Sequence, residues 1–571
     1  MFRRILGVLL PALLLGGFAV APASASGGYT PVSGAGSTWA YNAVDQWRRD
    51  VKQYGMQVNY SGTGSSDGRH QFLNGTQDFA VSDIPFQTNP TDGSAPEKPT
   101  AGTYAYMPIV AGGTAFMYHL TIGGRQVTDL RLSGTALTKV FTGAAAYWDD
   151  PAIKADNPGL QLPHEKVVPV VRSDGSGSSA QFTLWMAKQQ TALWQAYCAK
   201  VGRANACGET SYYPTSTGMI AQSGDLGVAG YISQSYGEGA IGYVNYSYAL
   251  NAHYPVAKIL NRAGYYTEPT PDNVAVSLLK AQINNDRSSA DYLTQQLDGV
   301  YSDGDPRTYI LSSYSYMILP LAVQGTFTTA KGRTLGAFSY YFLCQGQQEA
   351  PNLGYSPLPI NLVQAGFEQI RKIPGVVAQN INIQGCNNPT FSASGVNKLA
   401  TDAPQPAACD KQGSTQCTTP TGGAPGARSG SGGSGTGGGS ASSGGSGTGG
   451  SGTAGGATAG AGSAGGSGST GTGGTAGTSG GAGGSATGAG GATGGTGKVD
   501  PDTGQQVSAN SGASGGGTPV LASPVAVDAP GGWTGTQTLM LLAAVTLLAL
   551  ILAPALTARL VGAKSDEEKD K

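Results

Sequence analysis

One segment of this chain is too poor in large side chains to form a core. From about Thr418 to Gly517, within a predicted linker over residues 418–530, the sequence is nearly all Gly, Ser, Thr and Ala, and the 571-residue chain contains 91 glycines in all. Side chains this small bury too little apolar surface to offset the entropy lost on ordering, so the composition predicts a disordered linker. The folded domain is therefore expected before it, over residues 26–405, a length that suits two lobes.

The N-terminal residues predict export. Arg3 and Arg4 precede an apolar run and then small residues up to Ala25, which is the plan of a secretory signal peptide over residues 1–25. An uncleaved membrane anchor is the alternative, but the apolar run is short and ends in a sequence typical of a cleavage site. The segment has no cysteine, which excludes lipid attachment at a processed N-terminal cysteine.

A second apolar run, residues 538–558, predicts a transmembrane helix. At ~1.5 Å per residue it is long enough to cross roughly 30 Å of hydrocarbon. Arg559 and Lys564 follow it, and since basic residues tend to stay on the cytoplasmic side, residues 559–571 are expected to be a cytoplasmic tail. The alternative, a buried core helix, has no neighbouring folded domain to pack against. We therefore expect a single-pass membrane protein whose domain lies outside the cytoplasm.

The cysteine pattern predicts disulfide bonds rather than a zinc site. None of the six cysteines forms a Cys-x-x-Cys pair, and the chain has only four histidines. An even number of cysteines in an exported protein is typical of disulfides. The sequence leaves their connectivity open, and pairing of chain neighbours is the favoured hypothesis. These pairs are Cys198–Cys207, Cys344–Cys386 and Cys409–Cys417.

The charge of the chain excludes one class of partner. A formal net charge of −1 at pH 7 provides no basic surface for nucleic acid. We expect a monomer that carries no cofactor and no metal.

Strands, Gly- and Ser-rich loops and helices recur in the same order along the domain. The three loops are residues 34–38, 61–68 and 173–178. Predicted strands cover residues 57–60 and 166–171, and predicted helices begin near Asp67 and at Ser179. A further helix is expected after the first loop, with apolar residues on one side: Ala40, Ala43, Val44, Trp47 and Val51. This alternation is typical of α/β architecture.

Each of the three loops offers a similar set of hydrogen-bond donors. Glycine lets backbone N–H groups approach a ligand, Ser and Thr add hydroxyl groups, and a helix N-terminus adds partial positive charge. One such loop alone is more often a helix N-cap and turn. Three of them, with Arg172 directly before the third, predict an oxyanion site, because the planar guanidinium suits such a ligand.

Seven motifs occur in a characteristic order along the domain. They are Gly34-Ala35-Gly36-Ser37-Thr38-Trp39, Tyr60–Ser66, Asp78–Asp83, Trp148–Ile153, Asn157–Leu160, Val171–Ser178 and Gly239–Val244. Together they resemble the periplasmic phosphate-binding protein of bacterial phosphate ABC importers. The resemblance implies the two-lobed α/β fold of a type II periplasmic binding protein, with lobe 1 at about 27–117 plus 315–400 and lobe 2 at about 118–314. It also implies phosphate in the cleft, no catalysis, and importer permease subunits as partners.

The same resemblance implies a set of phosphate-binding residues. The set comprises Thr38, Trp39 through its backbone N–H, Ser65, Asp83, Arg172, Ser176, Gly177 and Ser178, with Asp174 supporting Arg172. Asp83 would accept a proton from the ligand. Phosphate keeps at least one proton near neutral pH whereas sulfate keeps none, so a buried acceptor penalises sulfate. Asp67 stands where the family usually has Gly, and it would either weaken binding or face away and cap the helix.

Two other functions remain open at this point. Residues 64–68 match Gly-x-Ser-x-Gly with Ser66 at the centre, as in the nucleophile elbow of serine hydrolases. However, that order also needs a later acid and then a histidine, and all four histidines lie well before the end of the domain. The linker and anchor would also suit a wall-spanning adhesin, or a sensor or store of phosphate. Saturable phosphate binding would distinguish a receptor from a hydrolase or an adhesin.

Overall fold

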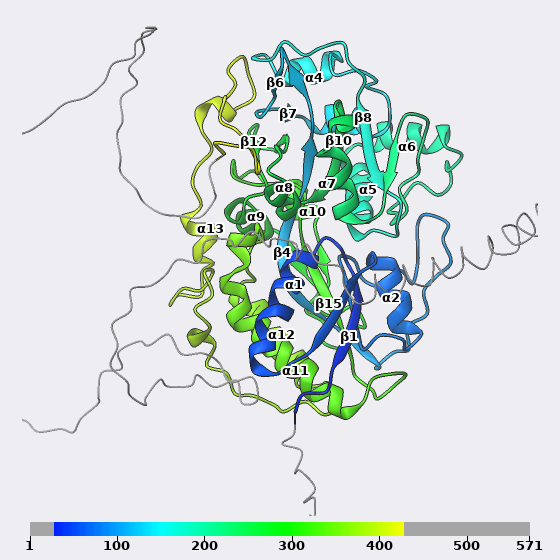
Figure 1. Ribbon diagram of the computed structural model, residues 1–571, viewed down its shortest axis with the longest axis vertical. Helices are drawn as coiled ribbons and strands as arrows, with labels where there is room; N and C mark the ends of the chain where they lie inside the picture. The colour runs from blue at the N-terminus through cyan, green and yellow to red at the C-terminus, as the bar shows by residue number, and fades with distance from the viewer. Residues whose placement is uncertain (1–27, 428–571) are drawn as a thin grey trace, which may run out of the picture. The chain divides into compact units, whose positions relative to one another are not determined.

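The computed structural model describes residues 28–427 (Figure 1). The predicted signal peptide, transmembrane helix and cytoplasmic tail, and nearly all of the predicted linker, lie outside these residues. Within the described range, no helix is both long and apolar enough to span a bilayer.

An eight-stranded sheet runs through the centre of the fold. Its strands, in spatial order, are β2 (Val58–Gly62), β1 (Val32–Gly36), β3 (Phe79–Ser82), β15 (Ser312–Pro320), β4 (Tyr104–Tyr118), β10 (Ala240–Asn245), β8 (Val168–Arg172) and β9 (Ile220–Gln222). β1 is parallel to β2 and β3, and β8 is parallel to β9 and β10. The central pairs are antiparallel. Loops that follow parallel strands leave from the same edge of the sheet, which gathers them.

Strand β4 belongs to both halves of this sheet. Residues Tyr104–Gly113 pair with β15, whereas Thr114–Tyr118 pair with β10. All 15 residues of β4 are buried. We call the part built on β2, β1, β3 and β15 lobe 1, and the part built on β10, β8 and β9 lobe 2. The predicted two-lobed α/β fold is confirmed.

Helices surround each part of the sheet (Figure 1). Those beside the strands of lobe 1 are α1 (Tyr41–Asp50), α2 (Ser65–Leu73), α11 (Thr329–Cys344) and α12 (Ile360–Ile370). Those that follow β4 along the chain are α3 (Gly134–Phe141), α4 (Pro151–Asp156), α5 (Gly177–Gln189), α6 (Thr191–Lys200), α7 (Gly224–Ile232), α8 (Tyr246–Ala252), α9 (Pro271–Leu278) and α10 (Asp298–Tyr301). The last helix, α13 (Lys398–Asp402), packs on α9.

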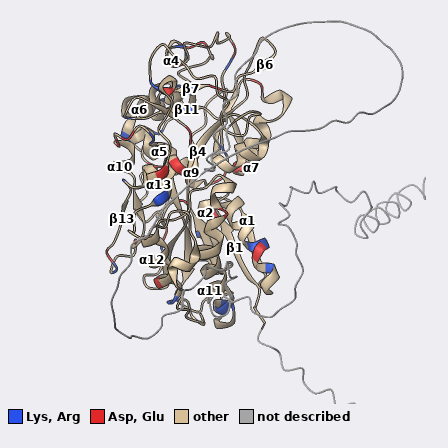
Figure 2. Ribbon diagram, turned by 90° about the vertical axis from the view of Figure 1, so that its left-hand side faces the viewer, with Lys and Arg blue, Asp and Glu red and all other residues tan. Residues whose placement is uncertain are grey.

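The other described strands are short. A three-stranded sheet contains β12 (Tyr266–Thr267), β11 (Lys258–Leu260) and β7 (Arg131–Leu132). Two hairpins pair β5 (Thr121–Ile122) with β6 (Arg125–Gln126), and β13 (Gln282–Ile283) with β14 (Gln295–Gln296). Charged residues of both signs are scattered along the ribbon of both lobes (Figure 2).

Helix α1 shows how the apolar pattern determines packing in lobe 1. The apolar side predicted for this helix is fully buried, as its spacing requires. Trp47 stacks on Phe342 of α11 with ring centroids 4.9 Å apart, and its Nε1 donates to the carbonyl of Gly346 at 3.0 Å. This packing fixes the helix that follows the first Gly-rich loop.

The helices after the second and third loops begin two residues earlier than the sequence predicted. Helix α2 begins at Ser65 and α5 at Gly177. Gly64 precedes α2 with φ +96°, which favours glycine, and the Ser176 hydroxyl caps α5 by accepting from the N–H of Ser179 at 3.2 Å. Ser65 and Gly177 therefore lie in the first turns of their helices.

The folded region extends beyond the predicted start of the linker at residue 418. Residues 418–427 pack against lobe 2, where the N–H of Thr421 donates to the carbonyl of Thr128 at 2.9 Å and the N–H of Gly422 donates to Glu268 at 2.9 Å. The Thr421 hydroxyl also donates to the carbonyls of Thr128 and Val256. Backbone groups and one small hydroxyl make these bonds, so the composition of the segment gave no sign of them.

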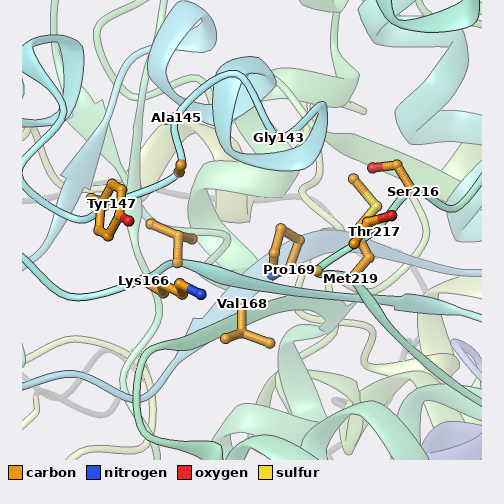
Figure 3. A pocket seen from close by; sticks show the side chains of 12 residues that line it. Gly143, Ala145, Tyr147, Lys166, Val168, Pro169, Ser216, Thr217 and Met219 are labelled. Atoms are coloured by element: carbon orange, nitrogen blue, oxygen red, sulfur yellow. The ribbon is translucent and has the colours of Figure 1, made fainter. Parts of the chain in front are cut away.

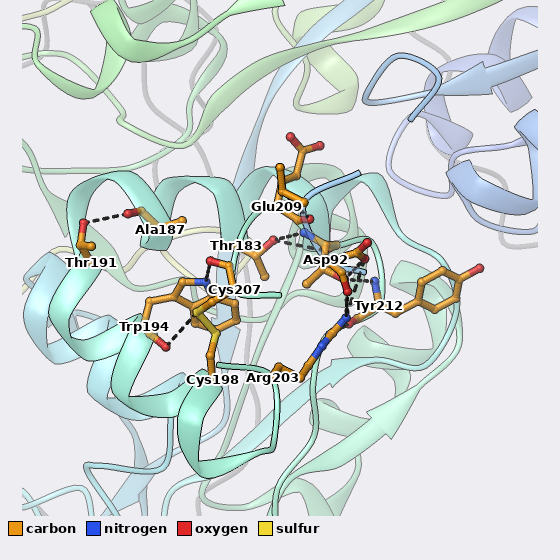
Figure 4. Close-up of a disulfide and its surroundings, with 12 residues drawn as sticks. Asp92, Thr183, Ala187, Thr191, Trp194, Cys198, Arg203, Cys207, Glu209 and Tyr212 are labelled. Carbon is orange, nitrogen blue, oxygen red and sulfur yellow. Dashed lines mark hydrogen bonds and ion pairs between the residues drawn. A yellow bond between two sulfur atoms is a disulfide. The ribbon is translucent and has the colours of Figure 1, made fainter. Parts of the chain in front are cut away.

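Three disulfides link Cys198 to Cys207, Cys344 to Cys386, and Cys409 to Cys417. The predicted pairing of neighbours is confirmed. The first of them joins α6 to the loop that leads to Thr210 (Figure 4). The third closes a short loop in the C-terminal segment whose Cys409 and Thr415 carbonyls accept from the guanidinium of Arg131.

Candidate functional site

The three Gly- and Ser-rich loops meet where the two lobes touch. The N–H groups of Thr63 and Gly64 donate to the carbonyl of Gly36, which joins the second loop to the first. The N–H of Ser66 donates to the carbonyl of Gly175 at 3.0 Å, which joins lobe 1 to lobe 2. Loops that are far apart in the sequence therefore form one cluster.

Glycines make this close approach possible. A Cβ atom at Gly177 would lie 2.5 Å from Oδ2 of Asp83 and 2.6 Å from the hydroxyl of Ser65. A Cβ atom at Gly64 would lie 2.6 Å from Oδ2 of Asp174. No side chain fits at these separations, so the loops of the two lobes can touch only because these positions are glycine.

Asp83 lies at the centre of a ring of hydroxyl groups. It follows β3, is only 3% exposed, and accepts hydrogen bonds from Ser37 at 2.7 Å, from Ser65 at 3.1 Å and from Ser315. Burial raises the pKa of Asp83 and the nearby Asp225 carboxylate raises it further, whereas the Ser315, Ser37 and Ser65 hydroxyls lower it. The site thus contains a buried carboxylate without a basic partner among the described residues.

Arg172 is the last residue of β8 and is 2% exposed. Its Nε and Nη2 donate to Asp174, as predicted, and its Nη2 also donates to the hydroxyl of Thr38 at 2.8 Å. Its Nη1 donates to Ser178 at 3.2 Å and to Asp225 at 2.6 Å. Burial lowers the pKa of Arg172, but Asp225 and Asp174 more than offset this, and the net shift is upward.

Backbone donors complete the cluster. Within residues 28–427, the N–H groups of Thr38, Trp39, Gly177 and Ser178 donate to no protein acceptor. Those of Gly177 and Ser178 belong to the first turn of α5, which points partial positive charge outward. The indole of Trp39 is buried and donates to Thr114 at 3.2 Å, so this residue can offer a ligand only its backbone.

All of the predicted site residues lie in this cluster. Ser176, the one not yet placed, shares a hydrogen bond with the hydroxyl of Ser178 at 2.8 Å. Asp67 is exposed on α2, where it accepts from Gln71. It thus faces away from the cluster, as one of the two readings expected, but it does not cap the helix, whose N-cap residue is Gly64 and has no side-chain cap.

Sequence reasoning missed three members of the cluster. Ser37 lies in the first motif but is not among the predicted phosphate-binding residues. Ser315 and Asp225 lie in none of the seven motifs. Ser315 is one of three serines in the fully buried strand β15 and lies next to a register shift that re-aims side chains. Asp225 follows β9 and the dipeptide Ser223-Gly224, so a fourth strand, Gly/Ser loop and helix could have been recognised.

The hydrolase alternative is not supported by the geometry around Ser66. Its hydroxyl accepts from Arg69 at 3.3 Å, and no histidine of the described residues contacts it. His70 contacts Glu97 at 3.4 Å, and His119 contacts Glu238 at 3.2 Å. A triad base is therefore not in place.

Asp92 makes a second inter-lobe contact, drawn in Figure 4 near the Cys198–Cys207 disulfide. Asp92 of lobe 1 accepts from the hydroxyl of Thr210 at 2.7 Å through Oδ2 and from Arg203 at 2.9 Å through its carbonyl. The loop that carries these partners is attached to α6 by the Cys198–Cys207 disulfide. This contact is the second one that holds the two lobes together.

A separate cavity of about 270 Å³ lies in lobe 2 (Figure 3). Lys166 is the only charged residue among those that line it, and Tyr147, Pro169 and Met219 supply apolar wall. It lies beside the first residues of β8, whereas Arg172 ends that strand. It is therefore distinct from the cluster of anion donors.

The fold and the cluster define a class of protein, and comparison with known families agrees. Residues 21–345 match the family model described as a PBP superfamily domain. The match covers more than half of the chain, and the chain belongs to this superfamily.

Individual relatives narrow the class. Phosphate-binding protein PstS of Xylella fastidiosa is 31% identical over 334 residues, which cover 58% of this chain and 83% of the relative. PstS of Methanocaldococcus jannaschii is 28% identical over 353 residues, covering 59% and 85% of the two chains. PstS of Pasteurella multocida is 29% identical over 336 residues, covering 58% and 88%. Within the superfamily, the chain belongs to the PstS family.

Proposed function

We propose that this chain captures inorganic phosphate outside the cytoplasm and delivers it to the permease of an ABC importer. The observation that carries the proposal is that Arg172 and Asp83, which do not pair with each other, are both buried in one cluster of hydroxyl and backbone N–H groups. A guanidinium attracts an oxyanion, whereas a buried carboxylate repels it unless the anion carries a proton. Phosphate meets both conditions near neutral pH and sulfate does not.

The predicted residues take complementary roles in this proposal. The hydroxyls of Thr38, Ser65, Ser176 and Ser178 and the N–H groups of Trp39 and Gly177 donate to phosphate oxygens. Arg172 pairs with the anion and is oriented by Asp174, while Asp83 accepts the phosphate proton. Neutral dipoles that are already in place cost little reorganisation when the anion arrives, so binding does not need an excess of basic residues.

Titration of the purified protein with phosphate, arsenate and sulfate tests the proposal. We expect one saturable phosphate site, competition by arsenate, which carries the same protons, and no comparable binding of sulfate. Absence of phosphate binding by calorimetry would refute the function. Turnover of a phosphate ester or a carboxylic ester would point to a hydrolase, and inertness to all of these ligands to an adhesin.

We also propose that the protein is held at the membrane by residues 538–558, with the predicted linker as a tether from residue 428 onward, since residues 418–427 pack against lobe 2. The apolar run and the basic residues after it support this topology. A flexible chain of ~110 residues spans on the order of 55–60 Å, which would hold the lobes away from the bilayer. Protease added to intact cells is expected to release the domain and leave a small stub in the membrane fraction. Recovery of the full-length chain from the culture medium would contradict the anchor.

A further inference from the structure

Asp225 occupies the point at which two of the proposed phosphate donors converge. Its Oδ2 accepts from the hydroxyl of Thr38 at 2.5 Å and from Nη1 of Arg172 at 2.6 Å. Its N–H donates in turn to the hydroxyl of Thr38 at 3.2 Å. This carboxylate oxygen therefore lies close to the position at which a phosphate oxygen would accept hydrogen bonds from the same two donors.

The hydrogen-bonding capacity of Arg172 is fully used in this arrangement. Its five N–H groups make five hydrogen bonds: two to Asp174, one to Thr38, one to Ser178 and one to Asp225. A bound anion must therefore share or replace at least one of these partners. Asp174 is the least replaceable of them, because it accepts from Nε and Nη2 together and also from the N–H of Gly224 at 2.9 Å.

Asp225 is also held firmly in place. Its side chain is fully buried, and its Oδ1 accepts from the N–H of Asn245 at 2.7 Å, at the junction of β10 and α8. Its backbone lies in the first turn of α7. Moving the carboxylate away would leave the Asn245 N–H buried without a partner, which is costly. We therefore expect Asp225 to stay beside the ligand.

The charges around Asp225 then restrict the protonation state of the ligand. The titratable groups that face Asp225 are Arg172, Asp174 and Asp83, together with the buried phenols of Tyr248 and Tyr355. One guanidinium thus pairs with two carboxylates, Asp174 and Asp225, while Asp83 is a third buried carboxylate that it does not contact. An unprotonated phosphate oxygen beside Asp225 would add a like charge in a buried place, whereas a P–OH group there would donate a hydrogen bond.

We propose that Asp225 accepts a second proton of the ligand, so that the site selects the monoanion H2PO4− over the dianion HPO4 2−. One P–OH donates to Asp83 and the other to Asp225, and the two unprotonated oxygens take the donors of Arg172 and the loops. No bond is broken, and at alkaline pH the protein takes the second proton from solvent together with the ligand. This inference rests on the proposed function and adds the protonation state of the ligand.

Calorimetric titration with inorganic phosphate between pH 6 and pH 8.5 tests the inference on the wild-type protein. Above the second ionisation of phosphate, we expect the apparent Kd to rise about tenfold per pH unit, since only the scarcer monoanion binds. Repeating the titration at pH 8 in buffers of different ionisation enthalpy should show uptake of about one proton per phosphate bound. A Kd that is constant from pH 7.5 to 8.5, without proton uptake, would overturn the inference while leaving the proposed function intact. Failure to bind phosphate at every pH would refute the function itself.

The variant Asp225→Asn tests whether Asp225 causes the pH dependence of phosphate binding. The amide can donate to an unprotonated oxygen, so the pH dependence should flatten to less than threefold per unit and the affinity at pH 8.5 should exceed that of wild type about tenfold. Asp67→Asn, which removes the same charge from an exposed position on α2, should retain the wild-type slope. An Asp225→Asn protein that is weaker by one constant factor at every pH would show that Asp225 only supports Arg172, and would overturn the inference. If this variant does not fold, the proton uptake of the wild type decides alone.

Discussion

Replacing Arg172 with alanine is expected to weaken phosphate binding by a few hundred-fold to several thousand-fold. Removing one partner of a buried charge pair typically costs about 3–5 kcal/mol, which corresponds to that loss in Kd. Arg172 is the only basic side chain that contacts the cluster's carboxylates among the described residues. Without it, neutral dipoles would hold the anion beside Asp83 and Asp225.

The same change should lower the melting temperature, because Asp174 and Asp225 would lose a buried partner. Arg172→Lys separates the two effects, since it retains the charge but not the planar fork, and we expect an intermediate loss of affinity in a folded protein. Lys188→Ala is the matched control: Lys188 lies on α5 and pairs at 2.7 Å with the exposed Asp298. Wild-type affinity in a folded Arg172→Ala protein would show that the cluster is not the phosphate site.

Replacing Asp83 with asparagine should reduce the discrimination between phosphate and sulfate by about ten- to a hundredfold. A hydrogen bond to a charged group contributes about 1.5–3 kcal/mol, and the amide both loses the acceptor charge and can donate to an unprotonated sulfate oxygen. The Ser37 and Ser65 hydroxyls can rotate to accept from the new amide. Phosphate affinity should therefore fall only modestly, while sulfate affinity rises.

Calorimetry with both anions on the wild type and on Asp83→Asn measures this ratio. Asp78→Asn provides a control, because Asp78 precedes the same strand and is also buried, but it pairs with Lys331 at 2.9 Å instead of facing the cluster. Asp78→Asn should lower the stability of the protein and leave the ratio of phosphate to sulfate affinity unchanged. If the ratio of phosphate to sulfate affinity does not change in Asp83→Asn, Asp83 does not select phosphate by accepting its proton.

The closed lobes explain why the cluster depends on glycine and serine. At Gly64 and Gly177 the two lobes are so close that a methyl group would overlap a carboxylate oxygen of the opposite lobe. At these two positions the backbone can approach the opposite lobe only without a side chain, which leaves its N–H groups and the neighbouring short hydroxyls as donors beside Arg172.

The sequence by itself determined the local features of this protein. Apolar periodicity predicted the helix around Trp47, and strand, Gly/Ser loop and helix recurred at each of the three loops. Cysteine parity predicted disulfides, and the favoured hypothesis, pairing of chain neighbours, is the one that the structure shows. These features depend on residues close together in the chain, so their physical cause is visible in a short stretch of sequence.

Only the tertiary structure decided which side chains share the space between the lobes. Ser315 reaches Asp83 across 232 positions of the chain, and Asp225 reaches Thr38 across 187. The strand that carries Ser315 and the helix that carries Asp225 showed no spacing that links them to the first loop. Pairing of β15 with β3 and β4, and closure of lobe 2 on lobe 1, bring them there. Such contacts arise from strand order and lobe packing, which depend on the burial of the whole core rather than on any local pattern.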